Sequence, residues 1–86
     1  MQIQTHKRYD VMWAELNREQ QIQVMSALRL FMTSQNKKQL RIHQLTGKYY
    51  PQYSLTVAED LRVHFLKVRK NKVVLMIVGT HDQLYG

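Results

Sequence analysis

A chain of 86 residues is enough for one compact domain, spanning residues 1–86, and too short for two. Its 44% hydrophobic content is typical of a folded protein, and the absence of cysteine excludes disulfides, a thiol nucleophile and a zinc finger. Thirteen Lys and Arg residues against six Asp and Glu residues give a net charge of +7, which indicates an anionic partner, either a nucleic acid or an acidic protein.

The positive charge is concentrated in the second half of the chain. Residues 1–36 contain four Lys or Arg against three Asp or Glu, whereas residues 37–86 contain nine against three. An anion-binding surface is therefore expected in the second half, although a solvated turn is an adequate interpretation of the basic run at 69–72. The amino terminus lacks the apolar stretch of a signal peptide, and the longest apolar run, 73–78, is too short to cross a membrane. We expect a cytoplasmic protein with no membrane partner.

The first half of the chain predicts a strand followed by two helices. Residues 1–5 alternate as in a strand with Ile3 facing inward, and Thr5 is placed to cap the next helix. In that helix, apolar residues recur at the spacing of one helix face, at Tyr9, Met12, Trp13 and Leu16. Asn17 is the expected N-cap of a second helix that runs to about Thr33. The predicted buried face of this second helix comprises Ile22, Met25, Leu28 and Met32, widened by Val24 and Phe31.

The second half predicts a loop and then three strands. Residues 34–38 end the helical period, and the stretch 40–53 contains Gly47 and Pro51, which favour a loop. From residue 53 the apolar period is two, which turns Arg62 and His64 away from the inward residues Tyr53, Leu55, Val57, Leu61, Val63 and Phe65. Residues 73–78 are apolar on both faces, as in a central strand.

These elements predict an α+β fold. It consists of an N-terminal strand, a helical hairpin and a three-stranded antiparallel meander, with the hairpin packed on one face of a mostly antiparallel sheet. Polar turns are expected at 59–60 and 69–72, between the three strands of the meander.

The residues available for chemistry are imidazole, guanidinium, ammonium and phenol groups. The sequence lacks the glycine-rich nucleotide-binding motifs and the serine-hydrolase elbow, and no histidine lies within four residues of another, so neither a metal nor a cofactor is expected. Histidine can transfer protons near neutral pH and Arg or Lys can stabilise phosphate charge, a combination that suits RNA cleavage by attack of the ribose 2′-hydroxyl. Composition alone, however, indicates an anion binder more directly than a nuclease.

Three segments carry a resemblance to a known family. They are residues 40–47 (LRIHQLTG), residues 53–65 with Asp60, Arg62 and Phe65 spaced as D-x-R-x-x-aromatic, and residues 78–85 (VGTHDQLY). In this order the chain resembles the RelE/ParE superfamily of toxins from type II toxin–antitoxin systems. The terminal pattern is similar to that of the YafQ-like and YoeB-like ribosome-dependent ribonucleases.

The resemblance implies a RelE-like microbial RNase fold and an endoribonuclease that cleaves mRNA in the ribosomal A site without a metal, which inhibits translation. Its implied partners are the ribosome, mRNA and a cognate antitoxin that covers the basic, partly apolar sheet face.

The resemblance also implies roles for individual residues. His81 would be the general acid or base, Tyr85 would stack on or hydrogen-bond the substrate nucleotide, and Arg62 would contact the scissile phosphate. His43 and Asp60 match further active-site positions of the YafQ-like branch. Two positions depart from that branch, because Thr56 replaces a common His and Leu61 replaces a common Trp, which leaves the division between acid and base open.

Basic side chains of the second half are expected to bind RNA phosphates. The predicted RNA-binding residues are Lys48, His64, Lys37, Lys38, Arg41 and Lys67. For His43 and His64 a purely structural role is an equally good interpretation.

Two other functions fit the same sequence. A ParE-like inhibitor of DNA gyrase would share the fold without RNA cleavage, and a basic RNA-binding module would bind without cutting. The presence of both His81 and Tyr85 favours the nuclease, because a gyrase inhibitor needs no acid–base groups there.

Overall fold

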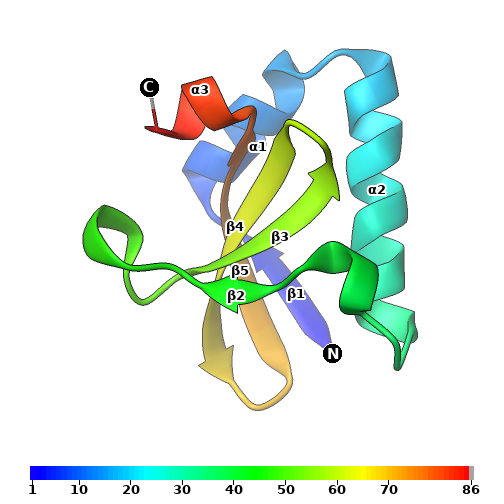
Figure 1. Cartoon of the computed structure of the whole chain (residues 1–86), viewed down its shortest axis with the longest axis vertical. Helices are drawn as coiled ribbons and strands as arrows, with labels where there is room; N and C mark the ends of the chain where they lie inside the picture. The colour runs from blue at the N-terminus through cyan, green and yellow to red at the C-terminus, as the bar shows by residue number, and fades with distance from the viewer. Residues whose placement is uncertain (86) are drawn as a thin grey trace.

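The computed structural model describes residues 1–85, which form one sheet covered by helices (Figure 1). The elements in chain order are β1 (Gln2–Thr5), α1 (Lys7–Glu15), α2 (Arg18–Thr33), the 3₁₀ turn η1 (Lys38–Leu40), β2 (His43–Gln44), the 3₁₀ turn η2 (Gly47–Tyr49), β3 (Tyr53–Ala58), β4 (Leu61–Arg69), β5 (Lys72–Gly79) and α3 (His81–Tyr85). The five strands are ordered β1-β5-β4-β3-β2. β1 pairs with β5 in parallel and the other neighbours are antiparallel, so the predicted α+β fold is confirmed.

The two long helices begin at side-chain caps. Asn17 accepts a hydrogen bond from the backbone N–H of Gln20, whose side chain in turn accepts from the backbone N–H of Asn17, as predicted for the start of α2. At α1 the prediction was off by one residue: the cap is His6, whose Nδ1 accepts from the N–H of Arg8 at 3.0 Å, and not Thr5. Thr5 is still paired with Leu75 as the last residue of β1, so it cannot also turn the chain into the helix.

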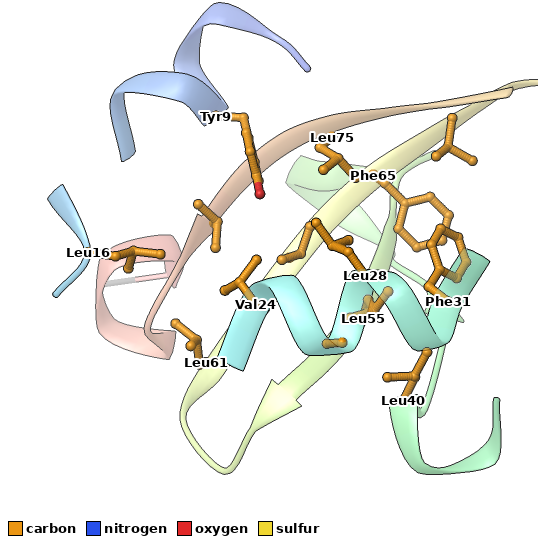
Figure 2. Close-up of a cluster of buried hydrophobic side chains, with 14 residues drawn as sticks. Tyr9, Leu16, Val24, Leu28, Phe31, Leu40, Leu55, Leu61, Phe65 and Leu75 are labelled. Carbon is orange, nitrogen blue, oxygen red and sulfur yellow. The ribbon is translucent and has the colours of Figure 1, made fainter. Parts of the chain in front are cut away.

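A single apolar core lies between the helices and one face of the sheet. α1 packs over β5 and α2 over β3. Figure 2 shows their side chains converging on Leu55, Phe65 and Leu75, with the Phe31 and Phe65 rings 5.0 Å apart between centroids. This core fixes which way every strand residue faces, since neighbours along a strand point to opposite sides.

The buried face of α2 differs from the predicted one. The residues that pack on the sheet are Val24, Ala27, Leu28 and Phe31, spaced as one helix face. Three residues predicted to be buried are instead exposed, namely Ile22 (57%), Met25 (53%) and Met32 (45%). Leu28 fits both the predicted face, with Met25 and Met32, and the observed face, with Val24 and Phe31. The apolar pattern alone therefore did not decide which face of α2 packs on the sheet.

Four short elements were not predicted as regular structure, and the first of them is the turn η1. The loop-rich stretch contains the two-residue strand β2, which pairs with β3 through His43 and Gln44, and the turn η2. The peptide bond between Tyr50 and Pro51 is cis. Residues 81–85 form the helix α3, and α3 and the η2 segment lie on the side of the sheet away from α2 (Figure 1).

Within residues 1–85, no helix combines the length and the apolar character that a membrane crossing requires.

The orientation of α2 can be tested with a pair of alanine substitutions. Leu28→Ala removes buried methyl groups and is expected to lower the free energy of unfolding by about 2–4 kcal/mol. Met25→Ala, one turn away on the exposed side, is expected to cost less than about 0.5 kcal/mol. Urea denaturation of the two variants measures both values, and equal losses would show that Met25 is buried after all.

Candidate active site

A row of side chains crosses the sheet on the face away from the core. In the strand register His43 of β2 is opposite Ser54 of β3, Ser54 is opposite His64 of β4, and His64 is opposite Ile77 of β5. Their neighbours Leu55, Val63 and Val78 belong to the core, so strand alternation places the row on the outer face. α3 packs against β5 and covers part of this face.

His64 lies at the centre of the row and is completely buried. Its Nε2 is 3.2 Å from the phenolic oxygen of Tyr85, and the Tyr49 ring contacts its edge with the centroids 4.8 Å apart. Its other ring nitrogen, Nδ1, has no hydrogen-bond partner among residues 1–85. The prediction that His64 contacts RNA is therefore wrong, because Tyr49 and Tyr85 stand between it and solvent.

Burial also sets the charge of this imidazole. It lowers the pKa of His64 from 6.5 to about 4, and the nearby His43 adds to the effect. At neutral pH the side chain is uncharged.

His81 and Tyr85 meet on the outside of this cluster. The two residues are one helical turn apart in α3, and their ring centroids are 4.8 Å apart. Tyr85 is 47% exposed, so one side of the ring is accessible while the other faces His64. Burial and the neighbouring Tyr49 raise the pKa of Tyr85, and Arg62 opposes this rise. The phenol is therefore protonated at neutral pH and lies within the electrostatic influence of the Arg62 guanidinium.

Arg62 is half-buried beside the β3–β4 turn. Its guanidinium donates to the carbonyls of Ala58 (2.6 Å) and Leu61 (3.2 Å). In the strand register Arg62 pairs with Gly79, two residues before His81, and its charge opposes the rise in the pKa of Tyr85. The structure thus brings His81, Tyr85 and Arg62, the residues to which the family resemblance pointed, into one region.

The start of α3 is fixed by a capping network. Thr80 and Gln83 form a reciprocal pair, in which each backbone N–H donates to the side-chain oxygen of the other at 2.8 and 3.3 Å. A Cβ at Gly79 would lie 2.6 Å from the same Gln83 oxygen and 3.3 Å from the Gln83 Cβ, so the Gln83 side chain would have to shift to make room for another residue. The Asp60 carboxylate accepts from the N–H of His81 at 3.2 Å. Asp60, predicted to be catalytic, is thereby shown in contact with the backbone that carries His81.

The predicted RNA-binding lysines and arginine divide into two groups. Lys48 is exposed beside Tyr49, with its ammonium 5.3 Å from the ring centroid, and Tyr49 in turn contacts Tyr85. His43, which was predicted to be catalytic, is exposed at the edge strand, where its Nδ1 is 2.9 Å from the Arg41 carbonyl.

The other four cations lie elsewhere on the surface. Lys67 is 4.4 Å from the Tyr53 ring and lines a hollow on the helix side together with Lys37 and Phe31. Lys38 and Arg41 line another hollow beside Leu30. Lys37, Lys38, Arg41 and Lys67 are therefore not part of the His81 cluster.

Sequence reasoning missed Tyr49, Ser54, Thr80 and Gln83. The last two carry the T-x-x-Q spacing of a capping pair, which was a readable signal. Tyr49 had none, because its O–H donates to the carbonyl of Leu84, 35 residues away, at 2.6 Å. Among residues 1–85, no group of three or more His, Asp or Glu side chains is placed to hold a metal ion.

Comparison with solved structures identifies the fold. A conserved hypothetical protein from Helicobacter pylori is 18% identical, with 99% of both chains covered and a TM-score of 0.70. YafQ in the DinJ–YafQ toxin–antitoxin complex of E. coli is 18% identical over 98% of this chain and 96% of that chain, with a TM-score of 0.67. The archaeal RelE–RelB complex from Pyrococcus horikoshii gives 12% identity, 92% coverage of both chains and a TM-score of 0.67.

These likenesses show that the chain has the fold of YafQ and RelE, as the sequence resemblance implied. No protein-family model and no curated protein sequence matches the chain.

The low pKa of His64 predicts a pH dependence of stability. Between pH 6.5 and about 4 the unfolded chain binds a proton at this position and the folded protein does not, so stability falls as the pH falls through this window. Wild type is expected to lose at most about 3 kcal/mol more than His64→Gln, which has no proton to bind. Urea unfolding near pH 7 and near pH 4.5 measures the difference. Equal losses in the two proteins would mean that His64 is protonated in the folded state.

Proposed function

We propose that this protein is the toxin of a type II toxin–antitoxin pair and acts in the cytoplasm as an endoribonuclease that cleaves mRNA in the ribosomal A site. The observation that carries the proposal is the meeting of His81, Tyr85 and Arg62 on the open side of the outer sheet face, in a chain with the YafQ and RelE fold. Exposed imidazole, phenol and a half-buried guanidinium supply the groups that metal-independent RNA cleavage requires.

The reaction assigned to these groups is a transesterification. The 2′-oxygen of the ribose loses its proton and forms a bond to the adjacent phosphorus, while the bond from phosphorus to the 5′-oxygen breaks and that oxygen gains a proton. His81 is exposed and transfers one of these protons. Arg62 stabilises the charge that grows on the phosphate oxygens, and the accessible side of Tyr85 stacks on the nucleotide.

Substrate binding would rely on the ribosome. Of the predicted RNA-binding lysines and arginine, Lys48 alone lies near the site, and one charge is too few to hold an RNA strand. The four cations outside the site, Lys37, Lys38, Arg41 and Lys67, would contact rRNA phosphates, so association is expected to weaken steeply with salt.

Primer extension on a ribosome-bound message tests the activity. Wild type is expected to cut within the codon that occupies the A site, and His81→Ala is expected to cut about 100-fold more slowly or worse, because general acid–base catalysis contributes at least that much. His6→Asn is the matched control: His6 only caps α1, and asparagine caps helices as well.

Equal cutting by wild type and His81→Ala would show that His81 has no catalytic role. Two further outcomes would contradict the nuclease itself. No cutting, together with trapped DNA cleavage by purified gyrase, would establish the ParE-like alternative, and RNA binding without either activity would establish the binding module.

The proposed antitoxin needs a surface on which to dock. In addition to the sheet face that the resemblance implies, we place an anchor for it on α2. Arg18, Ile22, Met25, Arg29 and Met32 are exposed and alternate in steps of four and three residues, a spacing that forms one straight seam along a helix. We call these five residues the outer seam. A hollow of about 490 Å³ beside Met25 is lined by Trp13, Ile22 and both arginines, among others. Apolar residues between two cations complement a helix with one apolar face flanked by Asp or Glu.

The outer seam predicts a binding defect. Met25→Glu places a negative charge where the acidic partner would pack and is expected to raise the Kd for the purified cognate antitoxin at least about tenfold. Gln23→Glu adds the same charge to an exposed position of α2 outside the seam and is expected to leave the Kd within about twofold. Should both variants bind like wild type, the antitoxin docks elsewhere, and the nuclease proposal is unaffected.

A further inference from the structure

We propose that His64 is a positioning residue: from beneath the surface its Nε2–H donates to the phenolic oxygen of Tyr85, which leaves the Tyr85 O–H free to donate to the RNA. This inference rests on the proposed nuclease function for its consequence, but the hydrogen bond itself can be measured without it. Three observations support it: the isolation of His64, the choice between its two neutral forms, and the clamp formed by Tyr49.

Within residues 1–85, Tyr85 is the one hydrogen-bond partner of the His64 side chain. The imidazole is completely buried, Nε2 is 3.2 Å from the Tyr85 oxygen, and Nδ1 has no partner in this described part of the chain. The residues opposite it in the register are Ser54 on β3 and Ile77 on β5, neither of which ionises. The ionisable groups nearest it are His43 on β2, Tyr49 on η2, Tyr85 on α3 and Arg62 on its own strand.

A neutral imidazole has two forms, and burial discriminates between them. With the proton on Nδ1, an N–H group would be buried without an acceptor, whereas with the proton on Nε2 only a lone pair stays unsatisfied. Buried N–H groups without an acceptor are rare in folded proteins and unsatisfied acceptors are less so. The Nε2–H form therefore predominates, and Tyr85 is the acceptor in its bond with His64 rather than the donor.

The direction of this hydrogen bond decides what Tyr85 can do. A phenol that accepts from His64 keeps its own proton, and its raised pKa keeps that proton bound at neutral pH. Because Tyr85 is about half exposed, the O–H can point toward solvent, on the side where its ring meets His81. Tyr85 then offers a hydrogen bond to a phosphate oxygen or to the leaving 5′-oxygen, in addition to stacking.

Tyr49 clamps the pair in place. Its ring contacts both His64 and Tyr85 edge-on, with centroids 4.8 and 5.6 Å away, and its O–H donates to the Leu84 carbonyl just before Tyr85. The Tyr85 ring is thus held against β4 by packing with Tyr49 and by the hydrogen bond from Tyr49 to the Leu84 carbonyl. Loss of His64 would leave the ring in place and its oxygen without a fixed direction.

The test combines kinetics with a structural measurement. His64→Leu replaces the imidazole with an apolar side chain of similar size and so removes the N–H donor. His64→Gln also removes the imidazole but supplies an N–H donor in its side chain. At saturating programmed ribosomes, His64→Leu is expected to lower kcat about tenfold with KM within about twofold, and His64→Gln is expected to recover most of the loss. In the Tyr85→Phe background His64→Leu is expected to have no further effect, since the oxygen it orients is gone.

The pH profile separates positioning from acid–base chemistry. Replacing His64 is expected to lower the cleavage rate without moving the pH optimum, because a group that stays neutral adds no titration near pH 7. A shifted optimum, an unchanged kcat in His64→Leu, or an equal loss of rate from His64→Leu in the wild-type and Tyr85→Phe backgrounds would each overturn the proposal.

An NMR measurement on the free wild-type protein tests the hydrogen bond without requiring nuclease activity or a folded variant. The ¹⁵N shifts of the His64 imidazole in wild type are expected to show a proton on Nε2, and Tyr85→Phe is expected to shift the Nε2 resonance while leaving the fold intact. A proton on Nδ1 would overturn the inference. If wild type cuts no message but the Nε2 proton is observed, the nuclease proposal fails while the hydrogen bond stands.

Discussion

The helices α1 and α2 cover one face of the sheet, and this one-sided burial determines where the polar chemistry of the protein lies. Leu55, Val63 and Phe65 pack into the core beneath the helices, so alternation along β3 and β4 sends their neighbours to the other face. In the part of the chain that the structure describes, α3 and the η2 segment lie over that second face. The result is a small cluster of tyrosines and histidines instead of a second apolar core.

Much of the fold was predictable because it depends on local signals. Asn17 marked the beginning of α2, and the alternation of apolar residues from residue 53 marked the main strands. Both signals act between residues that are near neighbours in sequence. Two features failed because contacts with distant residues decide them. The strand β2 depends on its pairing with β3, and the buried face of α2 depends on the sheet, since Leu28 fits either face of its helix. The helix α3 was missed although the spacing of Thr80 and Gln83 is a local signal.

The candidate site was predicted in part. The family resemblance pointed to His81, Tyr85 and Arg62, and the register of β4 with β5 explains why residues 19 positions apart in sequence lie together. Sequence position could not reveal that His64 is buried, because Arg62 and His64 alternate identically along the strand. The difference comes from Tyr49 and Tyr85, which cover His64 and leave its neighbour accessible. Basic residues were the least predictable, since Lys37 and Lys67 lie on the helix side of the sheet.

The parallel pairing of β1 with β5 has a consequence for how the molecule forms. Gln2 lies beside Lys72 and Thr5 beside Leu75. The sheet is therefore completed by a contact between segments about 70 residues apart in sequence. Closing so long a loop costs conformational entropy, which favours late formation of this contact during folding. α3 directly follows β5. The contacts that support the helix carrying His81 and Tyr85 come from η2, β4 and β5, which lie much closer to it in sequence, so they can form before the β1–β5 contact closes the sheet.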